Sequence, residues 1–180
     1  MKKLLIASCL ILSFCLLFIL LKPNKYIEQN NPIPKHLSTQ YKTEIEKIID
    51  IEYPLVIKKI DNLAKDAEEL KNKLPNNKVV KNNNFQQEYT NLCLIAEICI
   101  PATDLDLYAK IMQITQEKYL NIEYKPFATD NPSAFKDYLH PYFINNNVNQ
   151  NKLESISKYA NKKISVIEKY CTEIGKMQGY

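Results

Sequence analysis

Apolar residues recur at helical spacing over the stretch that follows residue 37. Two stripes with intervals of one, three or four residues come first: Tyr41, Ile45, Ile48, Ile49; then Val56, Ile60, Leu63, Ala67, Leu70, Leu74. Such intervals place side chains on one face of an α-helix. Pro54 stands between the stripes, so we expect a kink or break near Tyr53 and a helix from Leu55 to Leu74.

The same periodicity predicts further helices. Asn84 caps a segment over 84–100 that Pro101 closes, although the apolar run within it also fits a buried strand. Thr103 begins a helix to about Lys118, with Asp104 and Asp106 in its first turn; we interpret these carboxylates as partners of the helix dipole rather than metal ligands.

The remaining elements are shorter except for the last. Residues 119–126 alternate as an edge strand or extended linker would, and Asn131-Pro132 begins a short helix through Leu139. An amphipathic helix over about 150–174 ends at Gly175. The fold class is therefore all-α, a helical bundle of four to six helices over 38–180.

The chain opens with a different pattern. Residues 4–21 are uncharged and proline-free, follow Lys2 and Lys3, and would give about 27 Å of helix. The small residues that signal peptidase requires are missing just after this run, so we expect an N-terminal transmembrane helix, over 1–21, instead of a cleaved signal segment. Residues 22–37, with three prolines, predict an extended tether.

Two alternatives to a retained anchor stay open: secretion after cleavage, and a lipid anchor on Cys9, because Ile6-Ala7-Ser8-Cys9 resembles the lipobox of bacterial lipoproteins. The cationic start favours export, so we place the domain in the periplasm, held by the bacterial inner membrane. Richness in Lys, Asn and Ile without Arg or Trp suggests an AT-rich bacterial genome.

Composition limits the partners. Beyond the apolar run, 22 lysines face 20 acidic residues, which gives nucleic-acid binding no electrostatic support. Arginine is absent, so bidentate clamping of phosphate is excluded, and two glycines preclude a glycine-rich phosphate loop. We expect no cofactor and no metal, since ligand spacing is missing.

The domain holds three cysteines, Cys93, Cys99 and Cys171. In a helix, Cys93 and Cys99 lie too far apart to be bonded to each other. A disulfide would join Cys93 or Cys99 to Cys171, and three buried thiols are the alternative.

Candidate chemistry is sparse. His140 is the histidine outside the tether, and Glu97 stands among apolar neighbours, where burial would raise its pKa. A packed histidine and a solvent-facing carboxylate are the simpler interpretations. The segment 119–143 is rich in aromatic residues and prolines, which favours either a recognition surface or a plug for the end of the bundle. Its candidate partner-binding residues are Tyr124, Phe127, Phe135, Tyr138, His140, Tyr142 and Phe143.

We therefore expect a membrane-anchored, non-enzymatic protein-interaction or scaffold component of the bacterial envelope. A membrane-tethered hydrolase using His140 or Glu97, and a helical protein that binds an apolar ligand, are the alternatives.

Overall fold

A computed structural model describes residues 32–74, 83–124 and 132–178, which belong to one compact unit. The predicted anchor over 4–21 lies outside these ranges. The elements in chain order are a 3₁₀ turn η2 (Lys35–Leu37), α2 (Ser38–Lys73), α3 (Asn83–Leu94), a π-helical turn η3 (Ile95–Cys99), α4 (Ile100–Ile114), a second π-helical turn η4 (Thr115–Tyr119), α5 (Pro132–Asn145) and α6 (Asn151–Gln178). The described residues contain no strand, which confirms the all-α prediction, and α3, η3, α4 and η4 run on as one helix, so that the helices number four.

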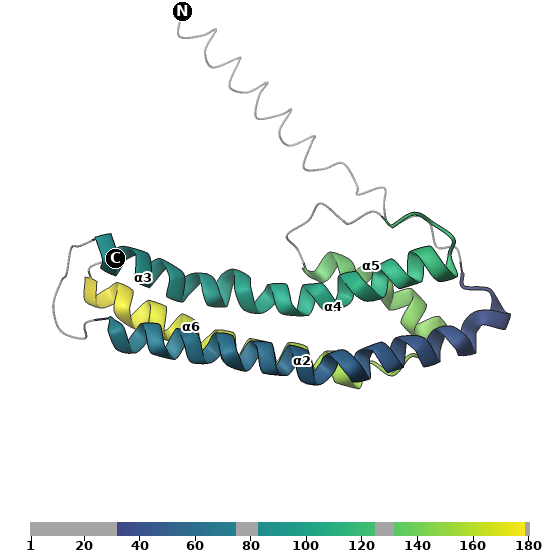
Figure 1. Cartoon of the computed structure of the whole chain (residues 1–180), viewed down its shortest axis with the longest axis horizontal. Helices are drawn as coiled ribbons and strands as arrows, with labels where there is room; N and C mark the ends of the chain where they lie inside the picture. Colours follow the sequence, from purple (N-terminus) through teal and green to yellow (C-terminus); the bar gives the residue numbers. More distant parts are fainter. Residues whose placement is uncertain (1–31, 75–82, 125–131, 179–180) are drawn as a thin grey trace, which may run out of the picture. The chain divides into compact units, whose positions relative to one another are not determined.

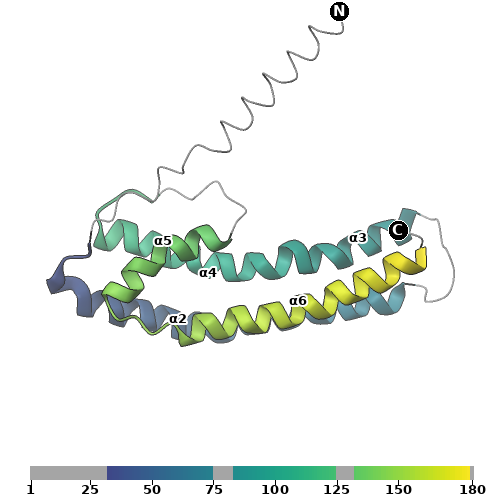
Figure 2. The same ribbon diagram turned by 180° about the vertical axis from the view of Figure 1, so that it is seen from behind.

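Helix α2 is the spine of the bundle, and the other long helices pack along it (Figures 1 and 2). The ion pairs between helices show their relative directions. Lys118 pairs with Glu44 and Lys59 with Asp106, so α4 runs antiparallel to α2. Helix α6 runs parallel to α2, because Lys152 pairs with Asp50 and Lys163 with Asp61. Helix α5 packs on α4.

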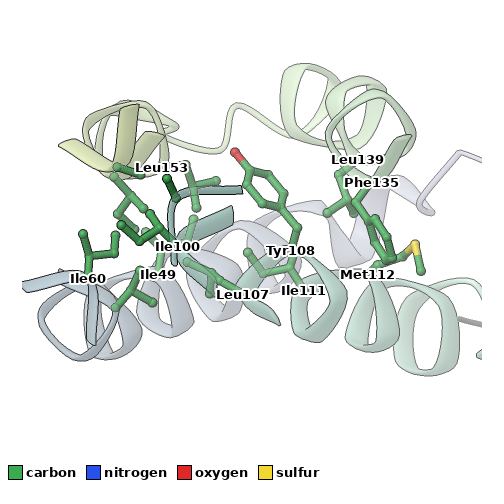
Figure 3. Packing of buried hydrophobic residues seen from close by; sticks show 14 of the residues in the cluster. Ile49, Ile60, Ile100, Leu107, Tyr108, Ile111, Met112, Phe135, Leu139 and Leu153 are labelled. Carbon is green, nitrogen blue, oxygen red and sulfur yellow. The ribbon is translucent and has the colours of Figure 1, made fainter. Parts of the chain in front are cut away.

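The core follows the apolar stripes of the sequence. Figure 3 shows how side chains from α2, α4, α5 and α6 meet between the helices. Fully buried members from these four helices include Ile45, Ile49, Ile60, Ile100, Ile111, Leu139 and Ile156. Burial of each such side chain contributes about 1.5–3 kcal/mol, which makes this contact the main stabilising term of the bundle.

Helix α2 does not break at Pro54, so the break was a wrong expectation and one helix spans Ser38–Lys73. The pyrrolidine ring lacks an N–H and crowds the carbonyl four residues earlier. Pro54 and Asp50 are both exposed, so the hydrogen bond that the proline removes lies on the solvent side of the helix, where such a loss is tolerated. The packing of Val56 and Ile60 then holds the helix on both sides of the proline.

Pro101 does not end a helix either. The π-helical turn η3 ends at Cys99, and α4 begins at Ile100 with the proline in its first turn. A π-turn shifts the register of the backbone hydrogen bonds, so the ordinary α-helical bonds are already interrupted at this point. The missing N–H and the bulky ring of Pro101 therefore disturb the helix little. Thr103 is accordingly no cap: its hydroxyl donates to the carbonyl of Ile100 within the helix.

Three boundaries also differ from prediction. Of the extended tether predicted over 22–37, Ile33 is buried and Lys35–Leu37 form a 3₁₀ turn, so these residues belong to the folded domain. Of the edge strand or extended linker predicted over 119–126, the strand is wrong: Tyr119 ends η4, and residues 121–124 are irregular, with Asn121 at a φ of 52°. Helix α6 continues through Gly175 to Gln178. Across the described ranges, none of the helices is both long and apolar enough to cross a membrane.

Candidate interaction surface

The aromatic segment proposed as a partner surface mostly seals one end of the bundle. Phe135, Tyr142 and Phe143 are buried, because α5 turns this face onto α4. Tyr138 is half-buried and accepts a hydrogen bond of 3.0 Å from the Gln116 amide, and Tyr124 is half-buried. His140 is exposed, and Phe127 lies outside the described residues. The structure therefore supports the plug interpretation for the buried members.

A second aromatic group surrounds the π-helical turn η4. The buried Tyr41 hydroxyl lies 3.1 Å from Thr115 Oγ1, which itself donates to the Ile111 carbonyl at 2.8 Å, so Tyr41 is the donor of the pair. The Tyr119 ring meets Tyr41 edge to face, and its hydroxyl donates to Glu44 at 2.5 Å. Burial raises the pKa of Tyr41. These contacts satisfy buried polar groups and fix α2 on α4.

Asp104 lies at the junction of α4, α5 and α6. Its Oδ2 accepts hydrogen bonds from Lys136 Nζ at 2.7 Å and Ser157 Oγ at 3.0 Å, and Lys136 lies 5.0 Å from the centroid of the Tyr108 ring. The expected role of Asp104 in a first helical turn is wrong, since the carboxylate is buried in mid-domain.

Lys136 Nζ also lies 2.9 Å from Ser157 Oγ, the pairing that a serine–lysine nucleophile would need. Such a nucleophile requires a neutral lysine to accept the serine proton. Here the serine hydroxyl donates its proton to Asp104 Oδ2 instead, and Lys136 Nζ donates to the same oxygen. The geometry is that of a three-helix ion-pair junction.

Glu97 and His140 are both exposed, on η3 and α5. Neither lines the clefts found beside α2. No cluster of three metal-ligating side chains occurs in the part of the chain that the structure describes.

Cys93 on α3 and Cys171 on α6 form a disulfide, with Cα atoms 5.8 Å apart. Of the two pairings that the sequence left open, the structure contains this one, and Cys99 is a half-buried free thiol. The Tyr89 hydroxyl donates to the Cys171 carbonyl at 3.2 Å beside the bond. Gly175 lies one turn after Cys171. A Cβ at this position would lie only 2.9 Å from the Tyr89 hydroxyl, so the glycine allows the close approach of Tyr89 rather than ending the helix.

One exposed apolar patch stands out on α2. We call Ile51, Pro54 and Leu55 the α2 patch; Ile51 is 54% and Leu55 57% exposed. Leu55 also lines a cleft of about 200 Å³ between α2 and α4 whose floor includes Val56 and Leu107.

Charged pairs cross this cleft at its rim. Lys110 pairs with Glu52, and Lys59 lies 3.2 Å from Asp106. The surface thus has an apolar centre and an ionic border, the layout of binding hot spots in protein interfaces. The periodicity of the core did not reveal it, because Ile51 and Leu55 fall between the buried positions of α2.

A larger cleft of about 420 Å³ lies between α2 and α6. Its lining is charged: Asp61 accepts hydrogen bonds from Tyr159 at 2.5 Å and pairs with Lys163 at 3.0 Å. These bonds lower the pKa of Asp61. A charged lining does not suit the apolar ligand considered from the sequence.

The chain matches no protein-family model, and no curated protein or solved structure is detectably similar to it.

Proposed function

We propose that this chain is a membrane-tethered, non-enzymatic protein of the bacterial envelope, whose helical bundle binds a protein partner through the α2 patch. The observation that carries the proposal is the patch itself, in which Ile51 and Leu55 are exposed and Leu55 lies at a cleft bordered by two ionic pairs.

Two independent features support a location outside the cytoplasm. The uncharged run over 4–21 is long enough for a membrane span and follows two lysines. The Cys93–Cys171 disulfide favours an oxidising compartment, since structural disulfides are rare where thiols are kept reduced. Both features suit a tethered periplasmic domain.

The patch fits a partner that presents an apolar side chain to the cleft and polar groups to its rim. Ile51 and Leu55 are each about half exposed, so their complete burial by a partner would contribute roughly 1–1.5 kcal/mol apiece. The charges of Lys110 and Asp106 at the rim of the cleft favour a partner that carries complementary charges around its apolar side chain. Because solvent already covers half of each side chain, their replacement leaves the bundle intact.

The test compares two double variants of the full chain after mild solubilisation of native membranes. Ile51→Ser with Leu55→Ser removes the α2 patch. Ile98→Ser with Ile144→Ser removes two equally exposed apolar side chains on other helices, at 58% and 56% exposure.

We expect the first variant to lose roughly tenfold or more of its affinity for the co-purified protein, while the second keeps it. Helix content and unfolding midpoint should be the same for both. Equal retention of the partner by both variants would show that the α2 patch is not the binding site.

A further inference from the structure

Helix α6 carries four exposed lysines along one outward line. Lys158, Lys162, Lys169 and Lys176 follow at intervals of four, seven and seven residues, so they share a face about 40° wide and about 27 Å long. We call this the lysine face. It points away from the core, because the buried residues Ile156, Ala160 and Ile167 occupy the opposite side of the helix.

The charge of these lysines is weakly compensated. Lys158 lies 4.0 Å from Glu154 and Lys169 lies 3.9 Å from Glu173, both as exposed pairs within the helix, which contribute little. Lys162 and Lys176 have no ion pair among the described residues. Glu168 lies on the far flank of α6. Across the cleft toward α2, Asp61 pairs with Lys163, and Glu68 lines the cleft beside Lys65. Helix α6 holds six lysines against three glutamates, although the described residues together hold 17 lysines and 18 acidic residues.

An apolar row runs beside the lysine face. Tyr159, Val166, Tyr170 and Met177 follow at intervals of seven, four and seven residues along α6. Val166 and Met177 are each 44% exposed, and the two tyrosines line the cleft toward α2. Lys71 from α2 lies 4.2 Å from the centroid of the Tyr170 ring and adds a positive charge to this border.

We propose that this side of α6 lies against an anionic phospholipid surface. Lysines around aliphatic and aromatic side chains are typical of helices that rest in a membrane interface, where ammonium groups meet headgroup phosphates and apolar groups reach the acyl boundary. Lysine stems extend along such a surface. A nucleic acid would engage the lysines and leave Val166 and Met177 without a role.

The strength of this contact suits a tethered domain. Each lysine near an anionic surface strengthens association about fivefold, so four of them hold a free domain only weakly. A tether raises the local lipid concentration and makes the weak contact effective. The inference rests on the membrane tether of the proposed function and is independent of the α2 patch, which occupies a different helix.

The test uses the full chain with vesicles of neutral phosphatidylcholine or of phosphatidylcholine mixed equally with phosphatidylglycerol. Flotation first reports whether the chain associates with each vesicle. Labelling of lysine amines, read by peptide mass spectrometry, then reports the exposure of Lys162 and Lys176 against Lys58 and Lys73 on α2.

We expect labelling of Lys162 and Lys176 to be at least about threefold slower on anionic than on neutral vesicles, and 0.5 M NaCl to abolish the difference. Lys58 and Lys73 should be labelled equally on both. Replacing Lys158 and Lys169 with Gln should weaken the protection, whereas Lys47→Gln with Lys58→Gln should leave it unchanged.

The outcomes separate the two proposals. Flotation with both vesicles but equal labelling would overturn the lysine face alone, and flotation with neither would contradict the tether as well. A soluble DNA duplex that protects the same lysines as strongly, at equal phosphate concentration, would overturn the assignment to lipid.

Discussion

Removal of the Cys93–Cys171 disulfide should produce the largest stability loss of any exposed or half-exposed change in the bundle. The bond closes a loop with a sequence separation of 78, and the chain-entropy relation gives about 4.5 kcal/mol at 25 °C for a loop of that length. A domain of this size has a free energy of unfolding of about 5–15 kcal/mol. The bond therefore accounts for a large share of it.

The assay is urea unfolding of the full chain followed by circular dichroism at 222 nm. We compare the oxidised protein with the Cys93→Ser, Cys171→Ser variant, with Cys99→Ser as control because its thiol is free and half-buried. We expect a loss of about 3–4.5 kcal/mol in the double variant and under about 1 kcal/mol in the control. A loss below about 1 kcal/mol in the double variant would show that the loop constraint contributes almost nothing to the stability of the bundle, contrary to this prediction.

Three further predictions concern single contacts. Asp104→Ala leaves Lys136 without its carboxylate and should lower the free energy of unfolding in urea by about 2–4 kcal/mol. The control Asp106→Ala, whose pair with Lys59 is exposed, should lower it by under about 1 kcal/mol. Equal losses would contradict the buried junction. Gly175→Ala should destabilise the native sequence, because the added Cβ meets the Tyr89 hydroxyl. In a Tyr89→Phe background the same change should stabilise the bundle by up to about 1 kcal/mol, since alanine favours helix. A change in unfolding free energy of the same sign in both backgrounds would contradict this contact. Burial raises the pKa of Glu44, but hydrogen bonds from Lys118 and Tyr119 outweigh this effect and hold the pKa below its usual value. The stability that Glu44 contributes is therefore complete above about pH 4.5 and is lost as the pH falls through the lowered pKa. The stability gap between the native chain and Glu44→Gln should accordingly narrow on acidification from pH 6 to pH 3, and a constant gap would contradict this.

Periodicity predicted the helices well because burial selects side chains at fixed spacing. The stripe from Val56 to Leu74 lies on the buried side of α2, and Leu153, Ile156 and Ile167 do the same for α6. The helix boundaries predicted at Pro54 and Pro101 were wrong, because the effect of a proline depends on its structural context. Pro54 faces solvent, and Pro101 follows a π-helical turn, which no sequence pattern announces.

The candidate surface was harder to predict than the fold. Aromatic richness over 119–143 left a recognition surface and a plug for the end of the bundle open, and Phe135 and Phe143 are buried where α5 packs on α4. The α2 patch consists of residues that interrupt the periodic pattern, and only the positions of α4 and α6 reveal that Ile51 and Leu55 stay uncovered. The balanced total charge likewise concealed the lysine face, which becomes visible when helix geometry aligns distant lysines.

The most direct test of the central claim is site-specific photo-crosslinking in the native membrane. A photoreactive amino acid replaces Leu55 in one variant and Ile144 in another, two residues of nearly equal exposure on different helices. If the α2 patch binds a partner, one defined protein is joined to the chain from position 55 and not from position 144. Crosslinks of equal yield from both positions, or none from position 55, would contradict a partner site on α2.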